Sequence, residues 1–343
     1  MSMPGRWVVV MFLGSLAALA ASGELTELLS LVPFFEEARA VFYGILSEPP
    51  ADLSTFLSFD NPAMNFVTDY DAGIAALYDV VGSSRTLVLD PMLRAVANIG
   101  WDPGSHHMGT LRQLLKELPP VDASAGVTLA APVLMVPRVF DFPLCDLLVQ
   151  LFDKMGGSDS GFLLDQDGKT GTVIDHRLKR RTDLPIVVPQ LCDTMRDQVV
   201  RRLLPAIERH FQFKATRMDR YLVSCYDSAV GGHFFRHRDN LNAGARHRRF
   251  AVSINLNSGY EGCDLVFPEF GTRSYRAPEG GAIVFACGTL HEVTPITRGR
   301  RYAFVPFLYG EEDAAIRAAN NANLDAGEAQ YVAGRDALFP AAE

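Results

Sequence analysis

The sequence predicts two domains, an α/β domain followed by an α+β domain built as a double-sheet jelly roll with bracing helices. Strand-like and helix-like segments alternate up to about residue 120, which is typical of an α/β fold. From residue 220 onward, short β-rich segments are separated by glycine turns, which is typical of a jelly roll. A chain of 343 residues is long enough for both domains.

The first domain, residues 1–120, opens with an apolar β-rich run from Trp7 to Leu13 that predicts a buried strand. Its other predicted elements are helices over 25–46, 71–80 and 109–118 and strands over 64–68, 85–89 and 95–99, the last two joined at Asp90-Pro91. The basic start and the apolar stretch to Ala21 also imitate a secretory signal peptide. We favour the buried strand, because the predicted helix over 25–46 continues a fold.

A linker is predicted over 121–130, after Pro119-Pro120 and through a run of small residues. The second domain then covers 131–310, and a surface helix with a mobile tail covers 311–343. Its predicted elements are helices over 143–155, 191–211 (kinked at Pro205) and 311–319, and strands over 133–136, 220–226, 250–257, 264–268, 281–287 and 300–308.

The net charge of −8 argues against bulk nucleic-acid binding. The five cysteines are irregularly spaced and odd in number, which favours reduced, mostly buried thiols in a cytoplasmic protein; they are Cys145, Cys192, Cys225, Cys263 and Cys287. The apolar N-terminal stretch is too short for a comfortable membrane span, so we expect no membrane partner.

His237, Asp239 and His291 form the strongest chemical pattern in the chain. Residues two apart on an extended strand point to the same face, so His237 and Asp239 can act together. With one distant histidine they make the ligand set of non-haem Fe(II) oxygenases. A histidine on a strand is more often structural than a ligand, but Gly231-Gly232 places the pair near a barrel rim. Arg301 follows His291 by ten residues and can face the same cavity.

Residues 131–309 resemble the Fe(II)- and 2-oxoglutarate-dependent dioxygenases, in the prolyl 4-hydroxylase-like branch. The segments that carry the resemblance are YDSAVGGHFFRHRD, FAVSINLN, GYEGCDLVFPEFG and APEGGAIVFACGTLHEVTPITRGRRYAFVPF. Cys263 stands where the family usually has glycine, and we expect it in a turn away from the ligands.

The resemblance implies that His237, Asp239 and His291 are catalytic and bind Fe(II). It implies that Arg301 pairs with the distal carboxylate of 2-oxoglutarate and that the Tyr226 hydroxyl helps to hold this cosubstrate. It further implies dioxygen as a reactant, ascorbate as a candidate reductant, and hydroxylation of a peptidyl side chain or a small molecule with release of succinate and carbon dioxide. The alternative is a non-catalytic binding or scaffold protein built on inherited folds.

Three questions stay open at this point. Arg300 competes with Arg301, and because adjacent strand residues face opposite ways only one can serve; the spacing favours Arg301. Substrate choice is expected in rim loops over 163–183 and 240–247. A group of basic residues either lines an entrance for an anionic substrate or, as we favour, is a solvated face: Lys179, Arg180, Arg181, Arg236, Arg238, Arg246, Arg248 and Arg249.

Residues 5–120 resemble a thioredoxin-like domain of the peroxiredoxin type, through the segments RWVVVMFLGS, FVTDYDAGIAALYDV and RTLVLDPMLRAVANI. Residues 1–144 contain no cysteine, and Ser15 near the expected active-site turn cannot replace one. We therefore predict a redox-inactive domain that serves packing, substrate capture or formation of a homodimer.

Overall fold

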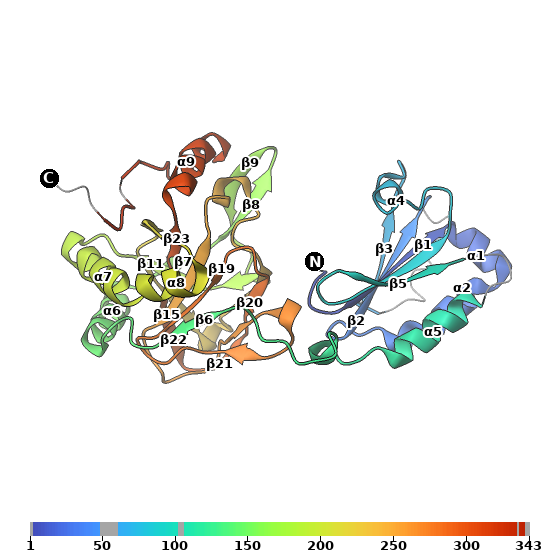
Figure 1. Cartoon of the computed structure of the whole chain (residues 1–343), viewed down its shortest axis with the longest axis horizontal. Coiled ribbons are helices and arrows are strands. Elements are labelled where there is room, and N and C mark those ends of the chain that lie inside the picture. Colours follow the sequence, from blue (N-terminus) through green and yellow to red (C-terminus); the bar gives the residue numbers. More distant parts are fainter. Residues whose placement is uncertain (1–2, 49–60, 102–105, 335, 340–343) are drawn as a thin grey trace. The chain divides into compact units, whose positions relative to one another are not determined.

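The computed structural model describes residues 3–48, 61–101, 106–334 and 336–339. They divide into two compact units, residues 1–131 with 268–272, and residues 132–267 with 273–343 (Figure 1). Each unit has its own cluster of buried apolar side chains, so each is described by itself.

The first unit is built on a mixed sheet of order β3-β2-β1-β4-β5. The central strand β1 (Trp7–Gly14) pairs in parallel with β2 (Ala40–Leu46), which pairs in parallel with β3 (Met64–Thr68). On its other side β1 pairs antiparallel with β4 (Arg85–Leu89), which forms a hairpin with β5 (Ala95–Gly100). The strand predicted over Trp7–Leu13 is confirmed, and it lies at the centre of a mixed α/β unit.

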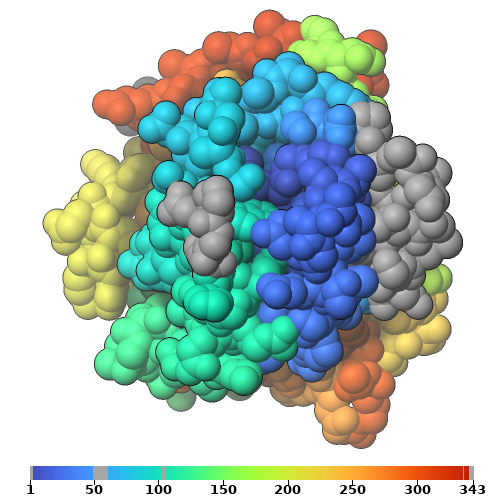
Figure 2. Space-filling view, turned by 90° about the vertical axis from the view of Figure 1, so that its right-hand side faces the viewer, coloured from blue at the N-terminus to red at the C-terminus, as the bar shows by residue number. Residues whose placement is uncertain are grey.

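The helices of the first unit are α1 (Leu16–Ser22), α2 (Glu24–Leu29), α4 (Gly73–Leu77) and α5 (His107–Glu117). Figure 2 shows the blue N-terminal helices and the blue-green α5 on the same face of this unit. No single helix in the described residues is long and apolar enough to cross a membrane, although the bent pair Leu16–Ser22 and Glu24–Phe34 passes by length and composition alone.

The helix predicted over 25–46 is wrong in its second half. The chain forms only α2 and a 3-10 turn before Ala40, and the rest is the parallel strand β2. Six of the seven residues of β2 are buried, because a parallel strand inside a sheet is covered on both faces. Such a continuous apolar run has no period of two, so its sequence cannot be told from a buried helix.

The second unit contains two sheets that supply side chains to a common pocket, the double-sheet arrangement that the sequence predicted. The larger sheet has the order β12-β23-β15-β22-β13-β11-β7, with β19 and β6 continuing from β15. Its strands are β6 (Leu134–Val136), β7 (Ser158–Asp159), β11 (Thr182–Pro185), β12 (Arg217–Asp219), β13 (Leu222–Asp227), β15 (Phe250–Asn255), β19 (Ala282–Ala286), β22 (Arg300–Phe304) and β23 (Phe307–Tyr309).

The smaller sheet has the order β10-β14-β20-β17-β18. Its strands are β10 (Lys179–Arg180), β14 (His233–His237), β17 (Leu265–Val266), β18 (Ser274–Tyr275) and β20 (His291–Val293). Two short hairpins complete the β-structure, β8 (Phe162–Gln166) with β9 (Lys169–Val173), and β16 (Glu261–Gly262) with β21 (Ile296–Arg298). The predicted rim loop over 163–183 is therefore largely β-structure.

The bracing helices of the second unit are α6 (Phe142–Met155), α7 (Pro189–Arg202), α8 (Leu204–Phe211) and α9 (Glu311–Asn320). The long helix predicted over 191–211 is interrupted at Leu203, and Pro205 lies in the first turn of α8, where its missing N–H costs nothing. The sequence predicts a mobile tail, but part of this tail is fixed to the second unit. Leu338 is buried in the core of this unit, and Asp336 accepts hydrogen bonds from Tyr309 and Arg317.

Candidate metal and cosubstrate site

The paired ends of two neighbouring strands bring His237, Asp239 and His291 together. His237 ends β14 and His291 begins β20, and the two are register partners. Asp239 follows two residues after β14, and its N–H donates to the carbonyl of Cys287 (2.9 Å). The Asp239 carboxylate lies 3.6 Å from Nε2 of His237 and 3.4 Å from Nε2 of His291. One donor atom from each residue falls within 4.8 Å of the others, so the three could hold one metal ion.

Both imidazoles are oriented for metal binding by a backbone carbonyl two residues earlier in the chain. Nδ1 of His237 lies 2.7 Å from the carbonyl of Phe235, and Nδ1 of His291 lies 3.0 Å from the carbonyl of Thr289. A carbonyl oxygen only accepts hydrogen bonds, so each Nδ1 carries the proton when the ring is neutral. The lone pair of each Nε2 then points toward Asp239, which is the arrangement that metal-binding histidines use.

The charges of the site also fit a divalent metal. Burial, with the neighbouring His237, lowers the pKa of His291 to about 4, so this ring is neutral at pH 7. Burial opposes ionisation of Asp239, but His291, His237 and Arg248 outweigh it and hold the pKa of this carboxyl below its usual range. A neutral imidazole and an ionised carboxylate are the forms that bind metal.

Arg301 carries a buried positive charge into the same pocket. It lies on β22 opposite Tyr226 of β13, and only 3% of its surface is exposed. Its guanidinium donates to Asn255 Oδ1 (2.9 and 3.0 Å), Ser253 Oγ (2.8 Å) and the carbonyl of Cys263 (3.1 Å). All of these acceptors are neutral, and no carboxylate in the described part of the chain pairs with it. A buried cation without an anion is costly, so this position favours an anionic ligand.

Arg300 points away from this pocket. It pairs with Asp227 (2.8 Å) and Asp153 (3.6 Å), and 56% of its side chain is exposed. Arg301 and Tyr226 both line the pocket that contains the three candidate ligands. The alternation of neighbouring strand residues therefore separates the two arginines, and only Arg301 faces the metal-binding residues.

Cys263 lies closer to the site than predicted. Its carbonyl contacts Arg301, and its Sγ lies 3.9 Å from the guanidinium. The turn between β16 and β17 folds against β22, a proximity that sequence distance does not show. Cys263 has a left-handed backbone (φ 58°), a conformation that glycine adopts most easily. It stays outside the group of candidate metal ligands.

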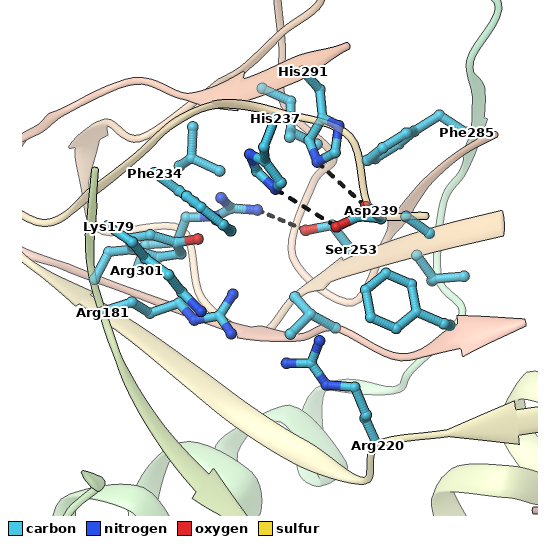
Figure 3. Close-up of a pocket in the computed structure, with 17 residues that line it drawn as sticks. Lys179, Arg181, Arg220, Phe234, His237, Asp239, Ser253, Phe285, His291 and Arg301 are labelled. Carbon is cyan, nitrogen blue, oxygen red and sulfur yellow. Dashed lines mark hydrogen bonds and ion pairs between the residues drawn. The ribbon is translucent and has the colours of Figure 1, made fainter. Parts of the chain in front are cut away.

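We favoured a solvated face for the basic residues of the rim, but in the structure they do not form one. Lys179 and Arg181 are buried and line the pocket beside Arg301 (Figure 3). Arg220, which the sequence did not single out, lines it too. Others pair locally, as Arg236 does with Glu292 (3.0 Å) and Arg249 with Asp313 (2.5 Å). In the sequence, the run Lys179-Arg180-Arg181 is the feature that indicates this cluster, and its first and third residues point into the pocket.

Two imidazoles and one carboxylate are the donor set that is typical of non-haem Fe(II) oxygenases, and here they share one pocket of a double-sheet domain with a buried arginine. Residues 221–309 match the model of the 2OG-Fe(II) oxygenase superfamily. This match covers the three candidate metal ligands with Tyr226 and Arg301, but not Lys179, Arg181 or Arg220. The C-terminal part of the chain is thus 2OG-Fe(II) oxygenase-like.

Relatives of known class are PKHD-type hydroxylases. The one from Synechococcus sp. (strain JA-2-3B'a(2-13)) is 30% identical over 117 residues, which cover 31% of this chain and 51% of that protein. The one from Hyphomonas neptunium is 32% identical over 142 residues, which cover 37% and 62%. The chain therefore spans about half the length of the curated relatives it matches.

Solved structures of prolyl hydroxylases also align with the chain. A Pseudomonas putida prolyl-4-hydroxylase is 16% identical, with 55% of this chain and 95% of that chain covered and a TM-score of 0.39. A prolyl hydroxylase from Trichoplax adhaerens is 16% identical, with 62% and 96% covered and a TM-score of 0.42.

Proposed function

We propose that this protein is an Fe(II)- and 2-oxoglutarate-dependent dioxygenase that hydroxylates a peptidyl side chain or a small molecule. One atom of dioxygen enters the product as a hydroxyl group, and the other enters succinate as 2-oxoglutarate loses carbon dioxide. The observation that carries the proposal is a single pocket that joins three metal-binding side chains to a buried, unneutralised arginine.

His237, Asp239 and His291 would hold the iron. Bound Fe(II) supplies the activation of dioxygen and the oxidation of the keto acid, and ascorbate is the reductant we propose for keeping it ferrous. The protein contributes a shielded site. Phe234 stacks on the His237 ring (3.5 Å between centroids), and Phe285 packs 4.6 Å from the His291 ring. These rings limit the access of water to the reacting atoms.

Arg301 would bind the distal carboxylate of 2-oxoglutarate. A guanidinium forms charge-assisted hydrogen bonds to a carboxylate, here from Nη1, and burial strengthens the interaction. Asn255 and Ser253 hold the guanidinium in one orientation, so little freedom is lost on binding. The Tyr226 hydroxyl is proposed as a second contact, because the residue is buried in the same pocket directly across from Arg301.

The assignment is tested by succinate formation in air with Fe(II) and 2-oxoglutarate, without added substrate. Wild-type protein should form succinate slowly, and His237→Ala should abolish it. His233→Ala is a matched control, because His233 lies on the same strand outside the pocket and its ring nitrogens lie within hydrogen-bonding distance of the carbonyls of Gly231 and Arg177. Equal turnover by wild type and His237→Ala, or none by either, would leave the non-catalytic scaffold as the better hypothesis.

For the first unit we propose a thioredoxin-like domain without peroxidase activity, serving packing, substrate capture or homodimer formation. A parallel pair of strands, an antiparallel hairpin and the closing helix α5 support this identity. The lack of cysteine in residues 1–144 removes the thiolate that peroxide reduction requires. The purified protein should consume no hydrogen peroxide, and light scattering would show whether it dimerises.

We also propose a cytoplasmic location, which the free thiols support. In the described structure Cys145, Cys225, Cys263 and Cys287 are buried and unpaired with one another, and Cys192 is partly buried. Mass spectrometry of the mature protein tests this location, because removal of the first 21 or so residues would indicate secretion.

A further inference from the structure

Three basic side chains line the pocket in addition to the residues proposed to hold iron and 2-oxoglutarate. They are Lys179, Arg181 and Arg220. Figure 3 shows Arg181 and Arg220 in the lower part of the pocket, with His237 and His291 above them and Lys179 at one side. Among the described residues that line the pocket, only Asp239 carries a carboxylate, and it belongs to the proposed metal site.

Lys179 is buried, and no carboxylate among the described residues pairs with its ammonium. Only 4% of its surface is exposed, and its ammonium donates to Ser160 Oγ (2.7 Å) and to the carbonyl of Gly161. The ammonium also lies 4.8 Å from the centre of the Phe234 ring, the same ring that stacks on His237. Burial and the nearby Arg181 hold the pKa of Lys179 well below its usual range. A bound anion would counter both effects.

Arg181 and Arg220 share a single carboxylate. Asp183 lies 2.7 Å from Arg181 and 4.0 Å from Arg220, and it does not line the pocket. Arg220 stacks on Phe307 (5.0 Å) and makes no side-chain hydrogen bond within the described residues. Together with Lys179, the group places three basic side chains beside one carboxylate, that of Asp183.

The backbone of Arg220 is strained. It has φ 63° between β12 and β13, a left-handed conformation that is unfavourable for any residue with a Cβ. Strained residues of this kind persist where the surrounding structure enforces them, and they concentrate at ligand sites. Here the conformation accompanies a guanidinium that lines the pocket and has no hydrogen-bond partner among the residues that the structure describes.

We propose that Lys179, Arg181 and Arg220 bind the anionic group of the primary substrate, which is therefore a small acid with a carboxylate or phosphate group. Guanidinium groups suit both oxyanions, and the ammonium adds a point charge. Phe234 lies beside Lys179 and Phe307 beside Arg220, and both rings line the pocket, so the carbon chain of the acid has apolar surface to contact between the cations and the metal site. This inference rests on the proposed oxygenase function and specifies its substrate class.

The test compares matched acids and neutral compounds. With Fe(II) and saturating 2-oxoglutarate, succinate formation is measured with monocarboxylic acids beside their primary amides, and with phosphate monoesters beside their parent alcohols. One acid series should stimulate turnover at least about tenfold more than its neutral partners, since the loss of one partner of a buried charge pair has an effect of this size or larger. The series that responds identifies the oxyanion.

Variants then assign the effect to the cluster. Arg220→Gln and Lys179→Met should each reduce the stimulation at least about tenfold, whereas Arg300→Gln, which removes a charge outside the pocket, should not. Arg181 is avoided, because its removal would leave the buried Asp183 with only the more distant Arg220 and would destabilise the fold. Equal stimulation by acids and neutral compounds would overturn the proposal. So would variants that raise the KM for 2-oxoglutarate and keep the stimulation, because the cluster would then serve the cosubstrate.

Calorimetric titration with inorganic phosphate and with acetate measures anion binding directly, so this test does not depend on turnover. If no compound stimulates succinate formation, anion binding to wild type that Arg220→Gln and Lys179→Met weaken at least about tenfold would still support the subsite. Binding that is absent, or unchanged in these variants, would overturn it. A wild type that binds the anion but forms no succinate would refute only the oxygenase function.

Discussion

Replacing Arg301 by glutamine should severely weaken 2-oxoglutarate binding. The guanidinium is 3% exposed and has only neutral partners, so the cosubstrate carboxylate would be its only counter-ion within the described part of the chain. Truncating one partner of such a buried charge pair costs about 2–5 kcal/mol. This corresponds to a rise in Kd of about 30-fold to several thousand-fold. Arg301→Lys keeps the charge but loses the fork, so its effect should be intermediate.

Arg300→Gln is the matched control. Arg300 is adjacent in sequence, but 56% of its side chain is exposed and its partners are Asp227 and Asp153. Exposed ion pairs contribute at most about 1 kcal/mol, so the Kd for 2-oxoglutarate should change by less than about fivefold.

The assay is calorimetric titration of 2-oxoglutarate into Fe(II)-loaded protein without oxygen, alongside the KM from succinate formation in air. Direct binding is needed because KM equals Kd only when chemistry is slower than dissociation. Two results would refute the reasoning: Arg300→Gln weakening binding as much as Arg301→Gln, or Arg301→Gln binding 2-oxoglutarate as wild type does.

Three further predictions concern metal binding, acid stability and one departure from the family. Fe(II) or Mn(II) at a hundred times its Kd should stabilise the protein by about 2.7 kcal/mol; the increase in Tm should vanish in His237→Ala and persist in His233→Ala. Burial raises the pKa of Asp219, but the neighbouring His247 ring (3.5 Å) and nearby arginines outweigh it and lower the pKa to about 2. The ionised Asp219 carboxylate stabilises the fold above about pH 4, and this stabilisation is lost as the pH falls toward 2. The unfolding free energy of Asp219→Asn should therefore fall by about 2 kcal/mol less than that of wild type over this pH range. An equal fall in both proteins would contradict this. Cys263→Gly removes left-handed backbone strain of about 1 kcal/mol and a weak contact between Sγ and Arg301. The KM for 2-oxoglutarate should therefore stay within about threefold of wild type. A large rise in this KM would show that the thiol positions Arg301.

Local patterns predicted the elements whose sequence is unambiguous. The strand over 85–89, the hairpin to 95–99 and the helix over 143–155 appear within one or two residues of their predicted bounds, because alternation, turn residues and helical spacing act over short distances. The segment Ala40–Leu46 was misassigned, because a strand covered on both faces loses its alternation. The break near Pro205 was anticipated, since proline restricts its own backbone.

For the site, the sequence by itself determined the chemistry of the donor atoms. Two imidazoles, one carboxylate and an arginine ten residues beyond the second histidine limit the candidate ligands before any fold is known. The tertiary structure decided which charges are left without a partner. Arg300 and Arg301 differ only in the sheet face they occupy, and Lys179, Arg181 and Arg220 meet because separate strands converge on one pocket. Burial and counter-ions depend on residues distant in sequence, so only the folded chain distinguishes a solvated arginine from one that awaits a ligand.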